Sequence, residues 1–137
     1  KLFSIVTAIN YAFAIPITFI STSIITLIYG ENYASGGSVF AVHVWSGLFV
    51  SLGVARGPCL IAEGLTKFSA ATTAMGAVVN IVLNYFLIAK YGIMGASIST
   101  IITNIIASYA SHIIYPKTRR IFIEQTKALL LMGFWKN

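Results

Sequence analysis

The stretch NIVLNYFLIAKYGIMGASIST, residues 80–100, places a single charge, Lys90, between two long apolar runs. These runs cover about residues 68–89 and 93–115, and each is as long as the roughly 20 residues that a helix needs to cross a bilayer. The link KYG is so short that the two helices must run antiparallel. Gly92 lies where the C-terminal cap of a helix favours a left-handed residue. The stretch therefore predicts a transmembrane hairpin.

Two further apolar runs precede this hairpin, at about residues 2–29 and 38–62. The first would reach roughly 42 Å as a helix, so we expect it to tilt, to protrude or to kink at Pro16. None of the runs shows the period-two alternation of a membrane β-barrel. We therefore predict an all-α, polytopic transmembrane helix bundle with four spans in residues 1–115.

The composition supports a membrane location and excludes several other classes of protein. The chain is 58% hydrophobic and only 9% charged, whereas soluble domains carry roughly 25% charged residues. Such a chain needs lipid or other membrane helices around it. The net charge of +6 lies in short loops and one tail, and it forms no basic stripe of the kind that binds nucleic acid. We therefore expect no nucleic-acid partner.

The last 22 residues, 116–137, mix charged and apolar side chains. On a helix, one side holds Arg120, Glu124 and Lys127, and the side away from it holds Ile121, Leu129, Met132 and Trp135. This pattern predicts a basic amphipathic helix in the membrane interface, with Trp135 at headgroup depth. The alternative is a frayed tail.

The distribution of Lys and Arg predicts the orientation of the chain. With four spans, a cytoplasmic tail places both ends of the chain inside. Only Lys90 is then outside. Seven positively charged residues are cytoplasmic: Lys1, Lys67, Lys117, Arg119, Arg120, Lys127 and Lys136. We therefore expect a multi-pass protein of the cytoplasmic membrane with both ends of this segment cytoplasmic.

The sequence shows no constellation typical of an enzyme. Its three acids, Glu31, Glu63 and Glu124, lie in or near loops or the tail. His43 and His112 fall on different predicted helices, near opposite membrane faces. We therefore expect no catalytic residue, no metal site and no cofactor. Cys59, the single cysteine, is interpreted as a small buried apolar residue.

Arg56, within GVARGPCLIAEG at residues 53–64, is the clearest candidate for a binding residue. It lies roughly 10 Å from the end of its predicted helix, where an unpaired arginine costs about 2.5 kcal/mol or more. In one interpretation it faces a water-filled cavity and binds an anionic group. In the other it is an anchor that reaches the headgroups, paired with Glu63. The following Gly-Pro is expected to loosen the helix and free backbone carbonyls there.

Asn80 and Asn84 are the second candidates, because a spacing of four places them on one helix face. Either they bond to a neighbouring helix or they contact a substrate. Asn10 and Asn104 are interpreted in the same two ways. Small residues form rows that let membrane helices approach closely, and we assign this packing role to Gly92, Gly95, Ala96 and Ser99.

Three segments carry a resemblance to a known family: LIYGENY, LIAEGLTK and the stretch at residues 80–100, with the Asn residues and YGIMGA the most specific part. From about Tyr29 to Thr100 the chain resembles the C-terminal region of bacterial polysaccharide-biosynthesis flippases. These are the translocases of O-antigen and related repeat units, in the multidrug/oligosaccharidyl-lipid/polysaccharide exporter superfamily. The resemblance does not fix an arginine at Arg56, so the role of Arg56 is argued from physics alone.

The resemblance implies a larger bundle of about a dozen helices in two halves, of which this chain would be the last third. It implies transport of an undecaprenyl-pyrophosphate-linked oligosaccharide across the cytoplasmic membrane for surface polysaccharides such as lipopolysaccharide. The implied partners are this lipid-linked oligosaccharide, membrane lipid and the remaining helices. Two alternatives stay open: a multidrug or small-molecule exporter of the same superfamily, and a membrane scaffold subunit that transports nothing.

Overall fold

A computed structural model of the chain describes residues 1–131 and shows only helices and short connections within them. In chain order the main helices are α1 (Leu2–Tyr29), α2 (Gly36–His43), α3 (Ser46–Ala62), α4 (Thr66–Tyr91), α5 (Ile93–Ile105), α6 (Ser111–Ile114) and α7 (Arg119–Leu129). Short helical turns, η1 (Glu31–Tyr33), η2 (Ile106–Ala110) and η3 (Pro116–Thr118), join some of them. The predicted all-α class is confirmed.

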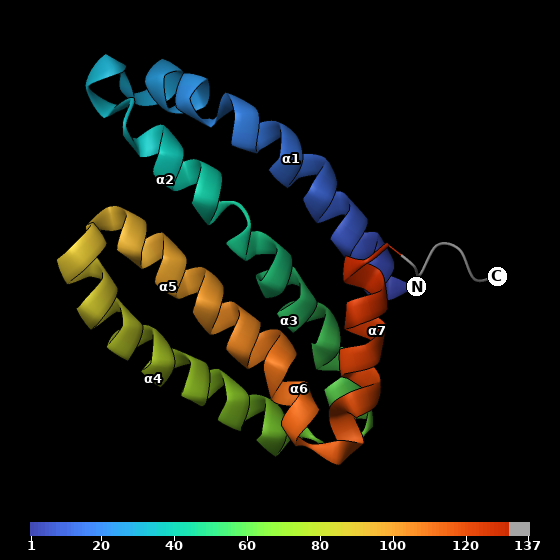
Figure 1. Cartoon of the computed structure of the whole chain (residues 1–137). Helices are drawn as coiled ribbons and strands as arrows, with labels where there is room; N and C mark the ends of the chain where they lie inside the picture. Colours follow the sequence, from blue (N-terminus) through green and yellow to red (C-terminus); the bar gives the residue numbers. More distant parts are fainter. Residues whose placement is uncertain (132–137) are drawn as a thin grey trace.

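Four helical segments among the described residues are long and apolar enough to cross a membrane. They are Leu2–Tyr29, Gly36–Ala62, Thr66–Tyr91 and Ile93–Ile114, and their bounds differ by at most two residues from the predicted ones. The segments run alternately up and down, and the chain begins at the end of the bundle where α3 ends and α6 lies (Figure 1). The predicted bundle of four helices that are long and apolar enough to span a membrane is therefore confirmed.

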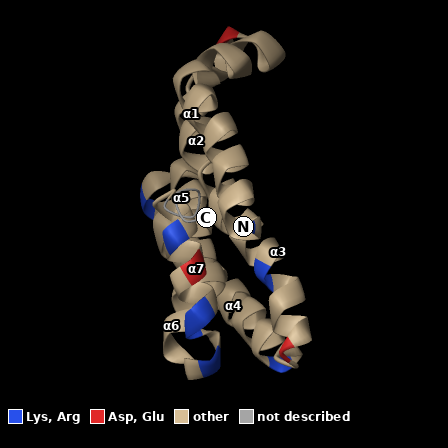
Figure 2. Cartoon of the chain, turned by 90° about the vertical axis from the view of Figure 1, so that its right-hand side faces the viewer, with Lys and Arg blue, Asp and Glu red and all other residues tan. Residues whose placement is uncertain are grey.

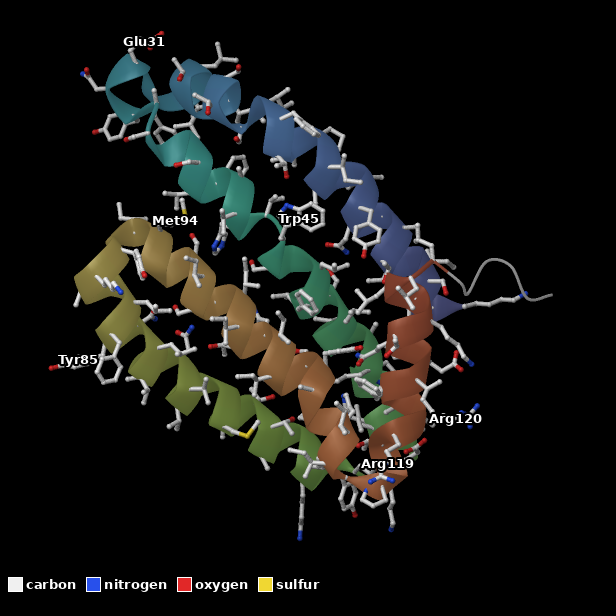
Figure 3. The ribbon with its side chains drawn as sticks, in the orientation of Figure 1. Glu31, Trp45, Tyr85, Met94, Arg119 and Arg120 are labelled. Atoms are coloured by element: carbon white, nitrogen blue, oxygen red, sulfur yellow. The ribbon has the colours of Figure 1, made fainter. Side chains whose placement is uncertain are left out.

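The interior of the bundle is built from small and hydroxyl-bearing side chains, while large apolar side chains face outward. Buried positions include Thr7, Ser97 and Ser99. Leu27 and Tyr85 are 87% and 77% exposed, and Figure 3 shows Tyr85 pointing away from the helices. Small and hydroxyl side chains let membrane helices approach closely and bond to each other, and an apolar exterior suits lipid. The arrangement is that of a membrane protein.

The second span is interrupted, but not where the sequence predicted. Helix α2 ends at His43 and α3 begins at Ser46, with tight turns in which the amides of Trp45 and Gly47 bond three residues back. At this break the Trp45 indole nitrogen donates to the Thr18 hydroxyl of α1 at 3.1 Å. The expected loosening after Arg56 is wrong, because α3 continues through Pro58 to Ala62. A proline within a helix removes only one backbone donor.

The fourth span contains one π-helical segment, η2, between α5 and α6. The amide of Ser111 bonds the carbonyl of Ile106, five residues back. Such π turns shift the hydrogen-bond register and are frequent at functional sites. Glycines let the neighbouring helices approach η2: a Cβ at Gly53 would lie 2.5 Å from the Ser108 hydroxyl, and one at Gly76 would lie 2.9 Å from the Ala107 Cβ. The η2 segment is therefore held tightly between α3 and α4.

The tail forms helix α7, which crosses the end of the bundle where α1 begins (Figure 1). Its inner face packs on the other helices through Gln125, which is fully buried. The Gln125 amide donates to the carbonyl oxygens of Leu52 and Ser108, at 3.3 and 3.2 Å. The Tyr11 hydroxyl of α1 donates to the carbonyl of Leu129 at 3.0 Å. The amphipathic helix is present, and its inner face meets protein.

The basic side of α7 remains exposed, as the sequence predicted. Arg119 and Arg120 point outward in Figure 3, and the exposed Lys127 and Glu124 form a salt bridge of 3.1 Å. The prediction for Trp135 lies outside the described residues.

Candidate functional site

Arg56 lies inside the bundle and is only 4% exposed. Its Nη1 donates to the carbonyl of Ala107 at 2.8 Å and contacts Nε2 of His112 at 3.0 Å. Its Nη2 donates to the Thr72 hydroxyl at 3.2 Å. The guanidinium thus joins α3 to α4, η2 and α6. A headgroup anchor would need its charged group at the surface, so the anchor interpretation of Arg56 is wrong.

The partners of Arg56 are neutral groups. Glu63, which the anchor interpretation paired with Arg56, is exposed. Within residues 1–131 the salt bridge found is the surface pair Lys127–Glu124. Buried charges are ordinarily paired with an opposite charge or with a metal. Arg56 therefore holds a positive charge that no described carboxylate neutralises.

The η2 segment supplies the nearest acceptor for this charge. The carbonyl oxygen of Ala107 accepts both Arg56 Nη1 and the Ser111 hydroxyl, each at 2.8 Å. A π turn opens a backbone carbonyl to side-chain donors, because its register shift removes one regular backbone partner. The sequence predicted that free backbone carbonyls near Arg56 would come from the helix of Arg56 itself. The carbonyl that bonds Arg56 comes instead from the fourth span.

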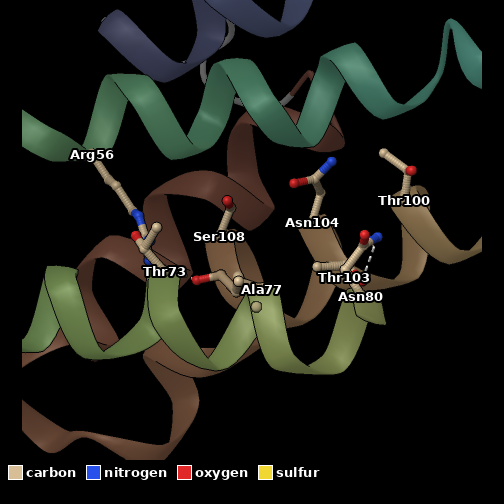
Figure 4. A pocket seen from close by; sticks show the side chains of 10 residues that line it. Arg56, Thr73, Ala77, Asn80, Thr100, Thr103, Asn104 and Ser108 are labelled. Carbon is tan, nitrogen blue, oxygen red and sulfur yellow. Dashed lines mark hydrogen bonds between the residues drawn. The ribbon is translucent and has the colours of Figure 1, made fainter. Parts of the chain in front are cut away.

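Arg56 also lines a cavity of about 350 Å³ between α3, α4 and the α5–η2 segment (Figure 4). The lining residues that carry polar side chains are Arg56, Thr73, Asn80, Thr100, Thr103, Asn104 and Ser108. A guanidinium has five N–H donors, and the three bonds above leave two of them without a partner among the described residues. In hydrocarbon, polar surface of this kind is tolerated where it contacts protein or water. We call this space the Arg56 cavity.

Asn80 and Asn84 form a polar ladder between α4 and α5. The Asn84 amide donates to Asn80 Oδ1 at 2.9 Å, and the Asn80 amide donates to the Thr103 hydroxyl at 3.4 Å. The Ser99 hydroxyl donates to Asn84 Oδ1. Asn80 also lines the Arg56 cavity, whereas Asn84 is not among the lining residues. The structure therefore brings Arg56 and Asn80 to one cavity and places Asn84 in helix pairing.

The other two asparagines differ in the same way. Asn10 accepts from the Ser51 hydroxyl at 3.4 Å and donates to the carbonyl of Val6, so it joins α1 to α3. Asn104 lines the Arg56 cavity. Its side-chain amide makes no hydrogen bond to a described residue, which leaves it open to a ligand or to water.

The four predicted packing residues divide between a turn and an interface. A Cβ at Gly95 would overlap the carbonyl of Leu87, so α4 and α5 touch here through their backbones. Ser99 is buried and Ala96 is half-buried on the same helix. Gly92 is exposed, has φ +58° and has open space where a Cβ would be. Gly92 therefore serves the turn, as its position after α4 indicates, and not a close helix contact.

Sequence analysis missed several residues of the site. His112 is fully buried beside Arg56, and Thr72 is 6% exposed. The available signal was positional: Arg56 and His112 lie near the same end of two spans in an antiparallel bundle. His43, by contrast, lines a second cavity of about 700 Å³ near the opposite end. Residues 1–131 contain no cluster of three His, Cys, Asp or Glu side chains that could hold a metal.

Water access to the Arg56 cavity is testable with single cysteines in a C59A background. We expect N104C to react with a membrane-impermeant thiol reagent, because Asn104 lines the cavity. The matched control is V78C, since Val78 is 61% exposed on the apolar side of α4 and should face lipid. A cysteine at position 104 that reacts only after denaturation would show that the cavity excludes water.

Comparison of the chain with protein-family models, with curated proteins and with solved structures gave no match.

Proposed function

We propose that this chain is part of a membrane transporter that moves a lipid-linked oligosaccharide across the bacterial cytoplasmic membrane for surface polysaccharide synthesis. In this proposal Arg56 binds the pyrophosphate that links the lipid to the sugar, and Asn80 and Asn104 contact polar groups beside it. The resemblance at residues 29–100 supports the class of substrate. The four apolar segments support the membrane location.

The observation that carries the proposal is a buried arginine with neutral partners at the wall of a polar cavity. Guanidinium binds phosphate oxygens through paired, charge-assisted hydrogen bonds. Because no described carboxylate neutralises Arg56, an entering anion would supply the missing negative charge. A bundle whose helices were polar only at packing contacts would not need such a cation, and this argues against the scaffold alternative.

The size of the Arg56 cavity limits what it can hold. Sites for small ligands usually occupy about 300–1,000 Å³, and this cavity of about 350 Å³ lies near the lower bound. It can take a pyrophosphate group, but an oligosaccharide and a long lipid must extend beyond it. We therefore propose that further helices complete the pathway, and that Arg56 with Asn80 and Asn104 forms the subsite for the charged link.

The proposed orientation has both ends of this segment in the cytoplasm. Lys and Arg gather around α6 and α7 at one end of the bundle (Figure 2), and Glu31 lies at the other end (Figure 3). Cytoplasmic ends of membrane proteins are rich in Lys and Arg. A topology reporter fused after Asn32 is therefore expected outside. A cytoplasmic signal from that fusion would reverse the orientation.

A second candidate function, export of an apolar small molecule, is favoured by the second cavity. Its volume is about 700 Å³, and aromatic side chains of Tyr29, Tyr33 and Phe40 line it together with His43. Mostly apolar pockets with a few polar groups are typical of drug-sized ligands. For this function, the ligand would bind mainly in the second cavity, near the proposed outer loops, and not in the Arg56 cavity.

Deletion of the encoding gene separates the two functions. For the proposed transporter, we expect loss of surface glycan and accumulation of the lipid-linked repeat unit on the cytoplasmic side, with both restored by the wild-type gene. A strain that exports normal glycan but becomes sensitive to apolar toxic compounds would reject glycan transport in favour of small-molecule export.

A further inference from the structure

The bond between Arg56 and His112 fixes the protonation state of the imidazole. A guanidinium carries only donors, so at 3.0 Å from Arg56 Nη1 the Nε2 atom of His112 must act as an acceptor. The imidazole is then neutral, and its single proton lies on Nδ1. His112 is fully buried, so this state is imposed by the protein and not by solvent.

The protonated nitrogen of His112 has no hydrogen-bond partner among residues 1–131. Nδ1 is buried and makes no hydrogen bond to any described residue. Buried polar atoms are almost always bonded, and an exception calls for a physical explanation. In His112, Nε2 therefore accepts a hydrogen bond from a cation, and the N–H group at Nδ1 lacks an acceptor.

Within residues 1–131, no buried charge other than Arg56 lies beside His112. Helix α3 contributes Arg56, and α4 contributes the ring of Phe68 at 5.6 Å between centroids. From η3, the Thr118 hydroxyl donates to the carbonyl of His112 at 3.2 Å. Arg119 of α7 is exposed and donates to the carbonyl of Ile113. Among the described residues, Arg56 is therefore the charge that directly controls His112.

Arg56 lines the cavity and also contacts His112, which does not line it. The lining of the Arg56 cavity includes Arg56, Ala107 and Ser108, but not His112. Figure 4 shows the Arg56 side chain reaching from α3 toward α4 across one end of the cavity. A movement of the guanidinium into the cavity would therefore uncover Nε2 of His112.

We infer that Arg56 and His112 form an anion-linked proton site, in which an anion that draws Arg56 into the cavity allows His112 to take up one proton. This inference rests on the proposed anion site at Arg56. In the resting state one Nη1 nitrogen serves both the Ala107 carbonyl and His112 Nε2. When that donor leaves, Nε2 accepts one proton that is supplied by bulk solvent through the cavity, and the neutral imidazole becomes an imidazolium.

Charge balance favours this exchange. In the resting state a second positive charge on His112 would lie against the guanidinium and be repelled by it. A bound pyrophosphate carries more than one negative charge, so it can balance both Arg56 and an imidazolium. Because binding equilibria are reciprocal, a protonated His112 must in turn strengthen anion binding. The site would therefore couple a proton to the movement of an anionic substrate.

The test uses ¹⁵N-histidine NMR of the full chain in lipid nanodiscs, with inorganic pyrophosphate as the probe. The chain has two histidines, so H43Q leaves His112 as the sole imidazole, and His43 is exposed. Without pyrophosphate at near-neutral pH we expect the Nδ1-protonated neutral tautomer. Saturating pyrophosphate should raise the ratio of imidazolium to imidazole at fixed pH by about tenfold or more, within the usual range for coupled sites.

A second measurement guards against effects of pyrophosphate ionisation. Pyrophosphate affinity is compared at two pH values in H43Q and in the double variant H43Q/H112Q, where glutamine keeps an acceptor for Arg56. The ionisation of pyrophosphate acts equally on both proteins. The inference predicts an additional tightening at the lower pH in H43Q alone, and an equal pH dependence in the two proteins would overturn it.

The outcomes separate the two proposals. Binding of pyrophosphate with an unchanged His112 spectrum would overturn the proton site and leave the anion site intact. Failure of pyrophosphate to bind at all would overturn both.

Discussion

Replacement of Arg56 by methionine is expected to weaken pyrophosphate binding by about 100-fold and to stop glycan export. Arg56 is the cation of the Arg56 cavity, and two of its five N–H donors have no partner among the described residues. Hydrogen bonds to charged groups contribute about 1.5–3 kcal/mol each, and about 3 kcal/mol corresponds to a factor of roughly 150 in the dissociation constant. Methionine has a similar length but no donor.

The same substitution should change the stability of the protein only slightly, because two effects oppose each other. Removing a buried charge that no carboxylate balances relieves a desolvation cost, as in proteins where apolar side chains replace buried ions. Against this, R56M leaves the carbonyl of Ala107 and Nε2 of His112 without a donor, and each such loss costs about 1–3 kcal/mol. We expect a melting temperature in detergent within a few degrees of the wild type.

Two further variants make the result specific to Arg56. R56K keeps the charge but loses the planar fork that binds two phosphate oxygens, so it should retain part of the affinity. R120M removes an exposed positive charge of α7 and should leave pyrophosphate affinity unchanged at moderate ionic strength. If R56M were folded and bound pyrophosphate like the wild type, Arg56 would be a structural residue and the anion site would be rejected.

The four spans could be predicted from the sequence because their cause is in the sequence. Lipid requires uninterrupted apolar runs with internally bonded backbone, and a charge, a glycine or a proline ends each run. The turn at Gly92 followed from the same logic, since its φ of +58° suits glycine. Helix α7 was also predictable, because the alternation of charged and apolar residues has a helical period.

The irregular points within the spans depend on partners that are distant in the sequence. The break before Ser46 lies where Trp45 bonds Thr18, which is 27 residues away. The η2 turn carries the carbonyl of Ala107, which bonds Arg56 51 residues away. Local propensity instead favoured a loosened helix at Gly57-Pro58, yet α3 continues through both residues. Tertiary contacts decide where a membrane helix departs from regular geometry.

The candidate site was predictable in its cation but not in its surroundings. A lone arginine in an apolar run is costly, so Arg56 could be identified directly. Nothing in the local sequence marks the neutral partners Thr72 and His112, because they contact Arg56 only when the helices pack together. The shared face of Asn80 and Asn84 was correct, yet α5 covers Asn84 through Ser99 while Asn80 also reaches the cavity. Only the packing of α4 on α5 distinguishes the two.

That packing depends on Gly95, and replacing it with alanine is expected to destabilise the protein by about 3 kcal/mol or more. A Cβ at this position would overlap the carbonyl of Leu87 and lie 2.9 Å from the amide nitrogen of Ile88. Both are backbone atoms of α4, so no side-chain rotation can relieve the clash. Overpacking typically costs about 1–3 kcal/mol even where side chains can adjust. Thermal denaturation in detergent should show a clear fall in the melting temperature.

Moving α5 away from α4 would also damage the Arg56 cavity. The polar ladder of Asn80, Asn84 and Ser99 crosses this interface, and α5 supplies part of the cavity wall. G95A should therefore weaken pyrophosphate binding even in the fraction of the protein that remains folded. Gly95 does not line the cavity, so weaker binding in G95A would result from the changed position of α5. R56M instead removes a side chain that lines the cavity.

The matched control for G95A is G57A, a substitution of the same size in a neighbouring span. Gly57 lies inside α3, where a Cβ would meet nothing within 4 Å. Alanine in a helix interior is more favourable than glycine by roughly 0.5–1 kcal/mol, so G57A should raise the melting temperature slightly. If G95A and G57A changed stability alike, α4 and α5 could not be in backbone contact at Gly95. The described packing of α4 on α5, which positions Asn80 at the cavity, would then be rejected.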